Sequence, residues 1–181
     1  MHCHSGNENL GDDAKNDTRI MAYEQLKLNN QLCFRLYTAS RLINQTYEPF
    51  LKPLGITYTQ YLVLMVLWEK DCQPVNEIGK RLMLGINTMS PLVKRMETQG
   101  LVERHGSETD KRQQLVCLTS KGKTLEADAA KVPDQMYQVF VRQHLSTGSL
   151  ISLIPGLDEI LNKLGNVSQE RTTVDNIEET N

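Results

Sequence analysis

The chain has 181 residues, 39% of them hydrophobic, and a formal net charge of −2. This length provides for one hydrophobic core, with at most an appended helical arm. No apolar run approaches the ~20 residues that a membrane-spanning helix needs, and the first twenty residues are polar rather than signal-like. We therefore expect a single cytoplasmic domain with no membrane partner.

The charge is distributed unevenly along the chain. Residues 74–123 hold nine Lys/Arg against five Asp/Glu, residues 124–181 hold four against nine, and residues 1–73 hold seven against eight. The basic segment can neutralise phosphates, although such contacts carry no sequence information by themselves. The small negative total therefore does not exclude a nucleic-acid partner.

The four cysteines are widely spaced, at Cys3, Cys33, Cys72 and Cys117. They form no CxxC pair and no metal-ligand grouping, so the spacing predicts neither a disulfide framework nor a metal site. We expect free thiols in a reducing compartment, with Cys72 a bystander in a polar connection. No motif indicates a cofactor.

Both ends of the chain are polar. Residues 1–20 are aperiodic and rich in Asn, Asp and Gly, and residues 166–181 are polar and acidic. Such segments bury too little apolar surface to fold. We expect a disordered extension over residues 1–22, a folded domain over 23–165 and a disordered tail over 166–181.

The first predicted helix runs from Leu28 to about Tyr47, where Pro49 discourages continuation. Its apolar face recurs at spacings of three or four: Leu28, Leu32, Leu36, Ala39, Ile43 and Tyr47. Cys33 lies on the flank of this stripe, with Tyr37 one turn further on. A free cysteine there is most often a small core residue, so a structural and a functional interpretation both stay open. Tyr47 follows Cys33 by fourteen residues, about 21 Å along one continuous helix, so the two could meet only across a homodimer.

A central helix follows. Thr57 and Gln60 form a capping-box pattern, and residues 58–68 are apolar nearly all round, which is typical of a buried helix. A polar connection over residues 69–73 leads to a short helix over residues 74–84 with Val75, Ile78 and Leu82 on one side.

The next helix, over residues 87–100, has two distinct faces. Its apolar face carries Met89, Leu92, Val93 and Met96. Asn87 or Ser90 can cap its start with Pro91 in the first turn, and Gly100 is a stop signal. Polar and basic residues occupy the other face.

A predicted hairpin follows, with strands over residues 101–104 and 113–118 joined by a polar turn. Helix, turn, helix and wing make a winged helix-turn-helix, in which the second helix enters a DNA major groove. The fold class is therefore mainly α with a small β wing. An ordinary helical pair followed by a surface hairpin remains the alternative on the pattern alone.

The remaining residues are predicted to be helical. Ser120 can cap a helix towards Lys131, and Pro133 opens another. A last apolar segment over residues 150–164 is interrupted by Pro155-Gly156. Its apolar residues pack either on their own domain or on a second copy; the second case would give a DNA-binding core over 57–120 with dimerisation helices over 23–52 and 121–165.

The residues from Leu26 to about Lys131 resemble the MarR family of dimeric winged-helix repressors, and within it the organic-hydroperoxide-sensing, OhrR-type branch. The matching segments are NNQLCFRLYTASR, GITYTQYLVLMVLWE, TMSPLVKRMETQGLVER and SETDKRQQLVCLTSKG. Asp110-x-Arg112 in the wing resembles the general signature, with Asp110 in a structural role. The cysteine of QLCF is specific to the thiol-sensing branch.

The resemblance implies that Cys33 is the peroxide-reactive residue. It also implies that Tyr47 and Tyr58 of the other subunit donate hydrogen bonds to its thiolate, with Tyr37 near the same pocket. The partner would be a pseudo-palindromic double-stranded operator, bound by residues of the second helix and the wing: Asn87, Thr88, Ser90, Pro91, Lys94, Arg95, Arg104, Lys111 and Arg112.

The expected function is a redox-sensing repressor. Attack of the thiolate on an organic hydroperoxide gives a sulfenic acid, which goes on to a mixed disulfide with a low-molecular-weight thiol or to overoxidation, and DNA is released. A one-cysteine mechanism is expected, because Tyr137 stands where two-cysteine members carry a resolving cysteine. Gly85 stands where relatives have an Asp, which can alter the coupling through Arg41.

Three alternatives differ in what the protein responds to. One is a broader thiol-based MarR regulator, and another is a MarR regulator that binds phenolic compounds. A thiol peroxidase is disfavoured, because no resolving thiol and no catalytic Arg/Thr constellation accompanies Cys33.

Overall fold

The computed structural model describes residues 23–106 and 113–165. The predicted disordered segments, 1–22 and 166–181, lie outside the described residues, as do Asp110, Lys111 and Arg112 of the wing turn. The chain divides into two units, residues 1–43 and residues 44–181, which are described separately.

The first unit holds the start of the long helix α1 (Leu32–Leu51). The prediction that this helix begins at Leu28 is wrong, because Glu24–Leu26 and Leu28–Asn30 form short 3-10 turns instead. The side-chain amide of Asn30 donates to the carbonyl of Glu24 at 2.9 Å, a local bond that competes with helix formation. Leu28, Leu32 and Leu36 are all exposed.

The second unit begins within α1, whose end also differs from the prediction. The helix continues through Pro49 to Leu51, so Pro49 does not stop it. Proline in a last turn removes one backbone hydrogen bond, and here the following Leu51 is fully buried in the core. A 3-10 turn, Lys52–Leu54, then ends at Gly55, whose φ of 71° reverses the chain.

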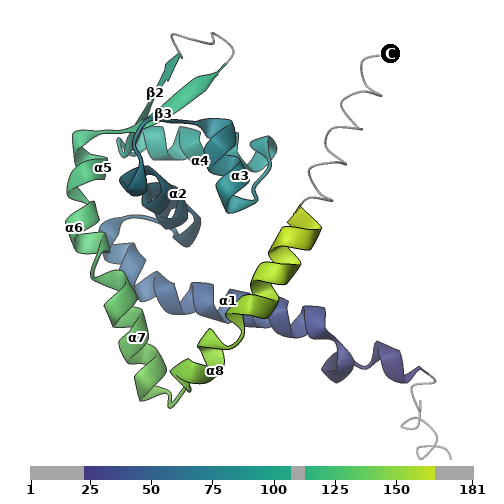
Figure 1. Ribbon diagram of the computed structural model, residues 1–181. Helices are drawn as coiled ribbons and strands as arrows, with labels where there is room; N and C mark the ends of the chain where they lie inside the picture. The colour runs from purple at the N-terminus through teal and green to yellow at the C-terminus, as the bar shows by residue number, and fades with distance from the viewer. Residues whose placement is uncertain (1–22, 107–112, 166–181) are drawn as a thin grey trace, which may run out of the picture. The chain divides into compact units, whose positions relative to one another are not determined.

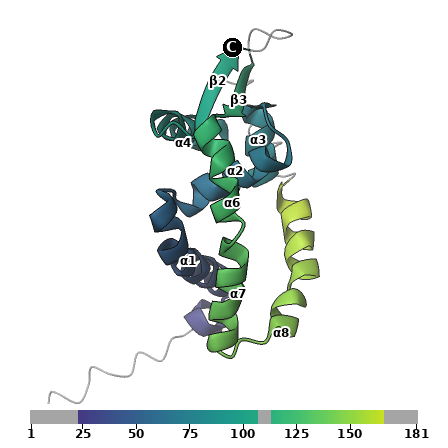
Figure 2. The ribbon, with the colours of Figure 1, turned by 90° about the vertical axis from the view of Figure 1, so that its left-hand side faces the viewer.

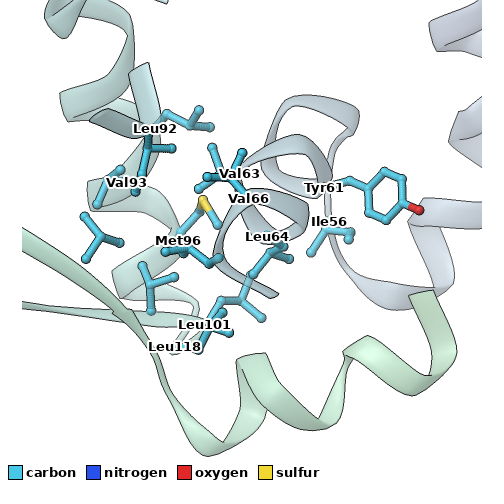
Figure 3. Close-up of a cluster of buried hydrophobic side chains, with 14 of the residues drawn as sticks. Ile56, Tyr61, Val63, Leu64, Val66, Leu92, Val93, Met96, Leu101 and Leu118 are labelled. Carbon is cyan, nitrogen blue, oxygen red and sulfur yellow. The ribbon is translucent and has the colours of Figure 1, made fainter. Parts of the chain in front are cut away.

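Helix α2 (Tyr58–Glu69) forms the centre of the core, as predicted. Its capping box is present: Thr57 Oγ1 accepts from the Gln60 amide at 3.4 Å, and Gln60 Oε1 accepts from the Thr57 amide at 2.9 Å. Figure 3 shows side chains of α2 facing those of α4 and the sheet. The labelled members of this cluster are Ile56, Tyr61, Val63, Leu64, Val66, Leu92, Val93, Met96, Leu101 and Leu118.

The predicted helix-turn-helix consists of α3 (Val75–Leu82) and α4 (Ile86–Thr98). Helix α3 lies close to both the turn and α4, since a Cβ on Gly79 would lie 2.8 Å from the Leu84 carbonyl oxygen in the turn and 3.2 Å from Met89 Cγ on α4. The prediction of a side-chain cap on α4 is wrong, because Gly85 is the N-cap. Pro91 consequently lies in the second turn rather than the first, where it is exposed and the carbonyl it leaves unpaired can be hydrated.

A three-stranded antiparallel sheet follows, in the order β1-β3-β2. The wing strands β2 (Val102–Gly106) and β3 (Gln114–Leu118) were predicted, and Figure 1 shows them extending away from the helices. The third strand, β1 (Gln73–Pro74), was not predicted. It pairs with β3 through Gln73 and Val116, so β3 is the central strand and has a partner at each edge. Residues 116–118 are all buried instead of alternating.

Further helices continue the second unit: α5 (Ser120–Thr124), α6 (Glu126–Ala129), α7 (Val132–Arg142), α8 (Thr147–Ile151) and residues 154–165. Thr119, not Ser120, caps α5, because its Oγ1 accepts from the Gly122 amide at 3.1 Å. Figure 2 shows the chain reversing after α7 through α8, so that the last helix runs back.

The last helices expose most of their large apolar side chains in the single chain. The exposed members are Ile151, Leu153, Ile154, Leu157, Ile160, Leu161 and Leu164. Among the described residues, no single helix has both the length and the apolar composition to cross a membrane; α1 and α2 meet that test only jointly, as a bent pair.

Candidate DNA interface and thiol site

Helix α4 separates an apolar face from a polar one. Met89, Leu92, Val93 and Met96 are buried against the core. Every residue of α4 for which DNA contact was predicted is exposed: Asn87, Thr88, Ser90, Pro91, Lys94 and Arg95. The helix therefore offers these side chains to an external partner while its other face fixes its position.

Arg104 of β2 forms an ion pair with Glu97 of α4. Its Nη2 lies 2.6 Å and its Nε 3.0 Å from Glu97 Oε2. The hydrogen bond from Arg104 lowers the pKa of the Glu97 carboxyl, so the pair is charged at neutral pH. This contact joins the wing to α4, and any DNA contact by Arg104 competes with it.

A buried amide joins the start of α2 to the end of α4. Gln60 is 3% exposed, and its Nε2 donates to Oε1 of Gln99 at 2.8 Å. The carbonyl of Gln99 accepts from Lys121 Nζ at 2.8 Å. The capping pattern predicted the local bond of Gln60 with Thr57, but nothing in the sequence pointed to this second bond.

Four aromatic side chains form a cluster inside the second unit. The rings of Tyr47 and Tyr58 are 4.8 Å apart, those of Tyr47 and Tyr61 6.4 Å, and those of Tyr61 and Trp68 6.2 Å. Burial raises the pKa of all three tyrosines, with smaller contributions from Tyr47 to Tyr58 and from both to Tyr61. The phenols are therefore protonated at neutral pH and can donate hydrogen bonds. The two tyrosines predicted to act together, Tyr47 and Tyr58, do lie together.

Cys33 lies on α1 in the first unit and is exposed. It is the only free cysteine among the described residues. Tyr37, one turn further on, is 68% exposed. Helix α1 is continuous from Leu32 to Leu51. The prediction that Cys33 and Tyr47 can meet only across a homodimer depended on this continuity.

The second unit contains an open apolar depression of about 270 Å³. Tyr47 and Tyr137 contribute to its wall. The other lining residues are Pro133, Met136, Phe140, Thr147, Leu150, Ile151 and Ile154.

The prediction of free thiols is wrong for Cys72 and Cys117, which form a disulfide. The reason is the unpredicted strand β1: its register pairs Gln73 with Val116, which brings the preceding Cys72 opposite the following Cys117. A separation of 45 residues hides this proximity in the sequence. Asp71 is the third member of this group, the only set of metal-ligand type found among the described residues.

Comparison with known proteins shows which family the chain belongs to. The MarR family model matches residues 56–113. The organic hydroperoxide resistance transcriptional regulator of Bacillus subtilis is 45% identical over 111 residues, which cover 61% of this chain and 76% of that protein. The chain belongs to the MarR family.

Solved structures agree with this assignment. Reduced AbfR bound to DNA is 38% identical, with a TM-score of 0.66 over 78% of this chain and 96% of AbfR. Disulfide-formed AbfR is 43% identical, with a TM-score of 0.53 over 72% and 97% of the two chains. AbfR is a protein of Staphylococcus epidermidis.

Membership of the MarR family confirms the predicted winged-helix fold and the predicted class of protein. The relatives are transcriptional regulators rather than enzymes. In this chain, α3, α4 and the hairpin β2–β3 form a helix-turn-helix with a wing, and the exposed face of α4 has a shape that a major groove can accept.

Proposed function

We propose that this MarR protein is a homodimeric cytoplasmic repressor that releases its operator when an organic hydroperoxide oxidises Cys33. The observation that carries the proposal is the exposed free thiol of Cys33 on α1, a helix whose apolar residues from Leu32 to Ile43 are exposed in the single chain. The similarity to a regulator of organic hydroperoxide resistance supports the choice of oxidant.

Dimerisation would cover two sets of exposed apolar side chains. One set is on α1 and includes Leu32 and Leu36; the other includes Leu157 and Leu161 near the end of the domain. Such surfaces on a small protein favour association. We assign residues 57–120 to DNA binding, and residues 23–52 and 121–165 to dimerisation. A symmetric pair reads two half-sites about 34–36 Å apart, which implies a pseudo-palindromic operator.

The proposed contacts to DNA come from the polar face of α4 and from the wing. Lys94 and Arg95 would supply positive charge to phosphates, and Asn87, Thr88 and Ser90 are short side chains suited to base edges at the start of the helix. Pro91, Arg104, Lys111 and Arg112 complete the proposed set, with Asp110 in a structural role in the wing.

The sensing step is a two-electron oxidation. The Cys33 thiolate attacks the peroxide O–O bond, giving a sulfenic acid and releasing the alcohol. A small thiol then condenses with the sulfenic acid, giving a mixed disulfide and water, or further peroxide overoxidises it. Phenols of Tyr47 and Tyr58 from the partner would stabilise the thiolate as donors, with Tyr37 nearby, and the bulkier product would disturb this packing and the spacing of the two α4 helices.

The proposal is tested by fluorescence anisotropy on the promoter of the protein's own gene. Cumene hydroperoxide at a stoichiometric ratio should weaken operator binding of the wild type by at least about tenfold, since tenfold corresponds to only about 1.4 kcal/mol. Cys33→Ser should bind and not respond, while Cys3→Ser should respond like the wild type. Release of DNA from Cys33→Ser by peroxide would contradict a Cys33 sensor.

The open apolar depression favours a second candidate, a regulator that responds to phenolic compounds. Its volume of about 270 Å³ and its aromatic wall at Tyr47 and Tyr137 suit a single aromatic ring. In that case salicylate would weaken operator binding of Cys33→Ser and of the wild type equally. A response to salicylate without a response to peroxide would favour this candidate over the thiol sensor.

A further inference from the structure

The disulfide between Cys72 and Cys117 lies inside the DNA-binding unit. Cys72 belongs to the turn after α2, and Cys117 belongs to β3, the second strand of the wing. We infer that these two residues are a reversible dithiol–disulfide couple, a second oxidation site that is separate from Cys33 and that an organic hydroperoxide closes. The inference rests on the proposed DNA-binding role in a reducing compartment, where disulfides are usually transient and redox-sensing.

The two cysteine residues differ in their exposure to solvent. Cys72 is exposed, whereas Cys117 is only 6% exposed. Oxidation of thiols follows exposure, so the Cys72 sulfur is the one that a hydroperoxide reaches first. Its attack on the O–O bond forms a sulfenic acid and releases the alcohol. The Cys117 thiol then condenses with the sulfenic acid, forming the S–S bond and releasing water. A dithiol reductant reverses the change and is itself oxidised to a disulfide.

Asp71 holds the two backbones in position without using either sulfur atom. Its Oδ1 accepts hydrogen bonds from the amides of Cys72 and Leu118, both at 2.8 Å, and its Oδ2 lies 3.1 Å from Lys123 Nζ. The Leu118 amide belongs to the residue next to Cys117. None of these contacts involves a sulfur atom, so reduction of the S–S bond removes none of them directly, and we expect the two thiols to stay within reach of each other. The sulfenic acid therefore meets Cys117 before it meets a second molecule.

Closing the disulfide restrains the connection between α2 and α3. Strand β1 leads directly into α3, yet it is only two residues long, and one of them is Pro74, which has no N–H to donate. With reduced thiols, this strand is held to β3 by a very short ladder and by Asp71. With the disulfide, the residues just before α3 are also cross-linked to strand β3 of the wing, through Cys72 and Cys117. Oxidation at this corner thus stiffens the helix-turn-helix itself.

The couple is tested first in the double variant Cys3→Ser/Cys33→Ser, in which only Cys72 and Cys117 can react. The fully reduced protein should show two titratable thiols, and stoichiometric cumene hydroperoxide should remove both. Non-reducing digestion should recover one intrachain link, and dithiothreitol should restore both thiols. The unfolding midpoint should rise on closure by about 5–15 °C and fall again on reduction. Persistence of both thiols, or links only between chains, would overturn the inference.

Two further variants and a cellular experiment complete the test. Cys72→Ser and Cys117→Ala, in the same background, should each leave the unfolding midpoint unaffected by peroxide. Acid quenching and alkylation of cells should find the dithiol in unstressed cells and the disulfide after a hydroperoxide challenge; a disulfide already complete in unstressed cells would overturn reversibility. Because Cys33 is absent from the first test, disulfide formation there supports this couple even where Cys33-dependent DNA release fails, and persistence of the dithiol overturns it even where that release succeeds.

Discussion

Asp71 shows how one charged residue stabilises the contact between the turn after α2 and the end of β3 in a pH-dependent way. Burial alone would raise the pKa of its carboxyl, but the amides of Leu118 and Cys72 and the ammonium of Lys123 together lower it below the ordinary value. Because the folded-state pKa is depressed, the stabilisation is fully present above the unfolded-state pKa of about 3.9 and is lost as the pH falls through the folded-state value.

Replacing Asp71 by Asn keeps the acceptor oxygen but removes the charge. We expect Asp71→Asn to lower the free energy of unfolding at pH 7 by about 1 kcal/mol, a modest value because the carboxylate is partly exposed. The difference from wild type should shrink as the pH falls below about 4. Urea denaturation at several pH values measures this. Asp128→Asn, which removes an exposed ion pair with Lys131, is the control and should change little.

At the scale of elements, a hydrogen bond from the buried amide of Gln60 links the start of α2 to the end of α4. Gln60→Ala would remove half of the capping box and the bond to Gln99 together. We expect a loss of about 1–3 kcal/mol in the free energy of unfolding, because the Thr57 amide and the buried end of α2 lose their partners. Gln135→Ala, an exposed position on α7, is the control. Equal stability of the two variants in urea would show that the amide link contributes nothing.

The salt dependence of operator binding can test whether Lys94 of α4 contacts DNA. Lys94 is exposed on the polar face of α4. If its ammonium contacts one phosphate, Lys94→Ala should weaken binding at low salt and reduce the slope of log K against log salt by about one unit. Lys131→Ala, an exposed lysine beyond the winged helix, should leave the slope unchanged. An unchanged slope for Lys94→Ala would remove that residue from the interface.

Sequence patterns predicted the features that depend on residues close together in the chain. The capping box of Thr57 and Gln60 spans three residues, and the buried face of α4 follows from helical spacing alone. The contacts that were missed join distant residues: Gln60 and Gln99 are 39 apart, and Cys72 and Cys117 are 45 apart. Both depend on how the elements pack, and β1 is too short to carry a strand pattern of its own.

At the scale of the whole molecule, the exposed apolar side chains determine the expected assembly. Only Leu51 is buried among the residues of α1, and the helix over residues 154–165 exposes Leu157, Leu161 and Leu164. A single chain would leave these leucines in water, at a cost of about 25 cal/mol per Å² of apolar surface. We therefore expect the purified protein to be a dimer in solution, and this state to be required for tight operator binding.

The double variant Leu157→Asp/Leu161→Asp tests that expectation. Two carboxylates in an apolar interface would lose hydration without a partner, so the variant should be monomeric by sedimentation equilibrium at concentrations where the wild type is a dimer. Its operator affinity should fall by at least about tenfold, because each monomer engages only one half-site and the gain from linking two sites is lost. Asn76→Asp, an exposed position on α3, adds a charge outside the two segments assigned to dimerisation and should remain dimeric. A dimeric Leu157→Asp/Leu161→Asp protein with unchanged affinity would place the subunit contact on another surface of the molecule.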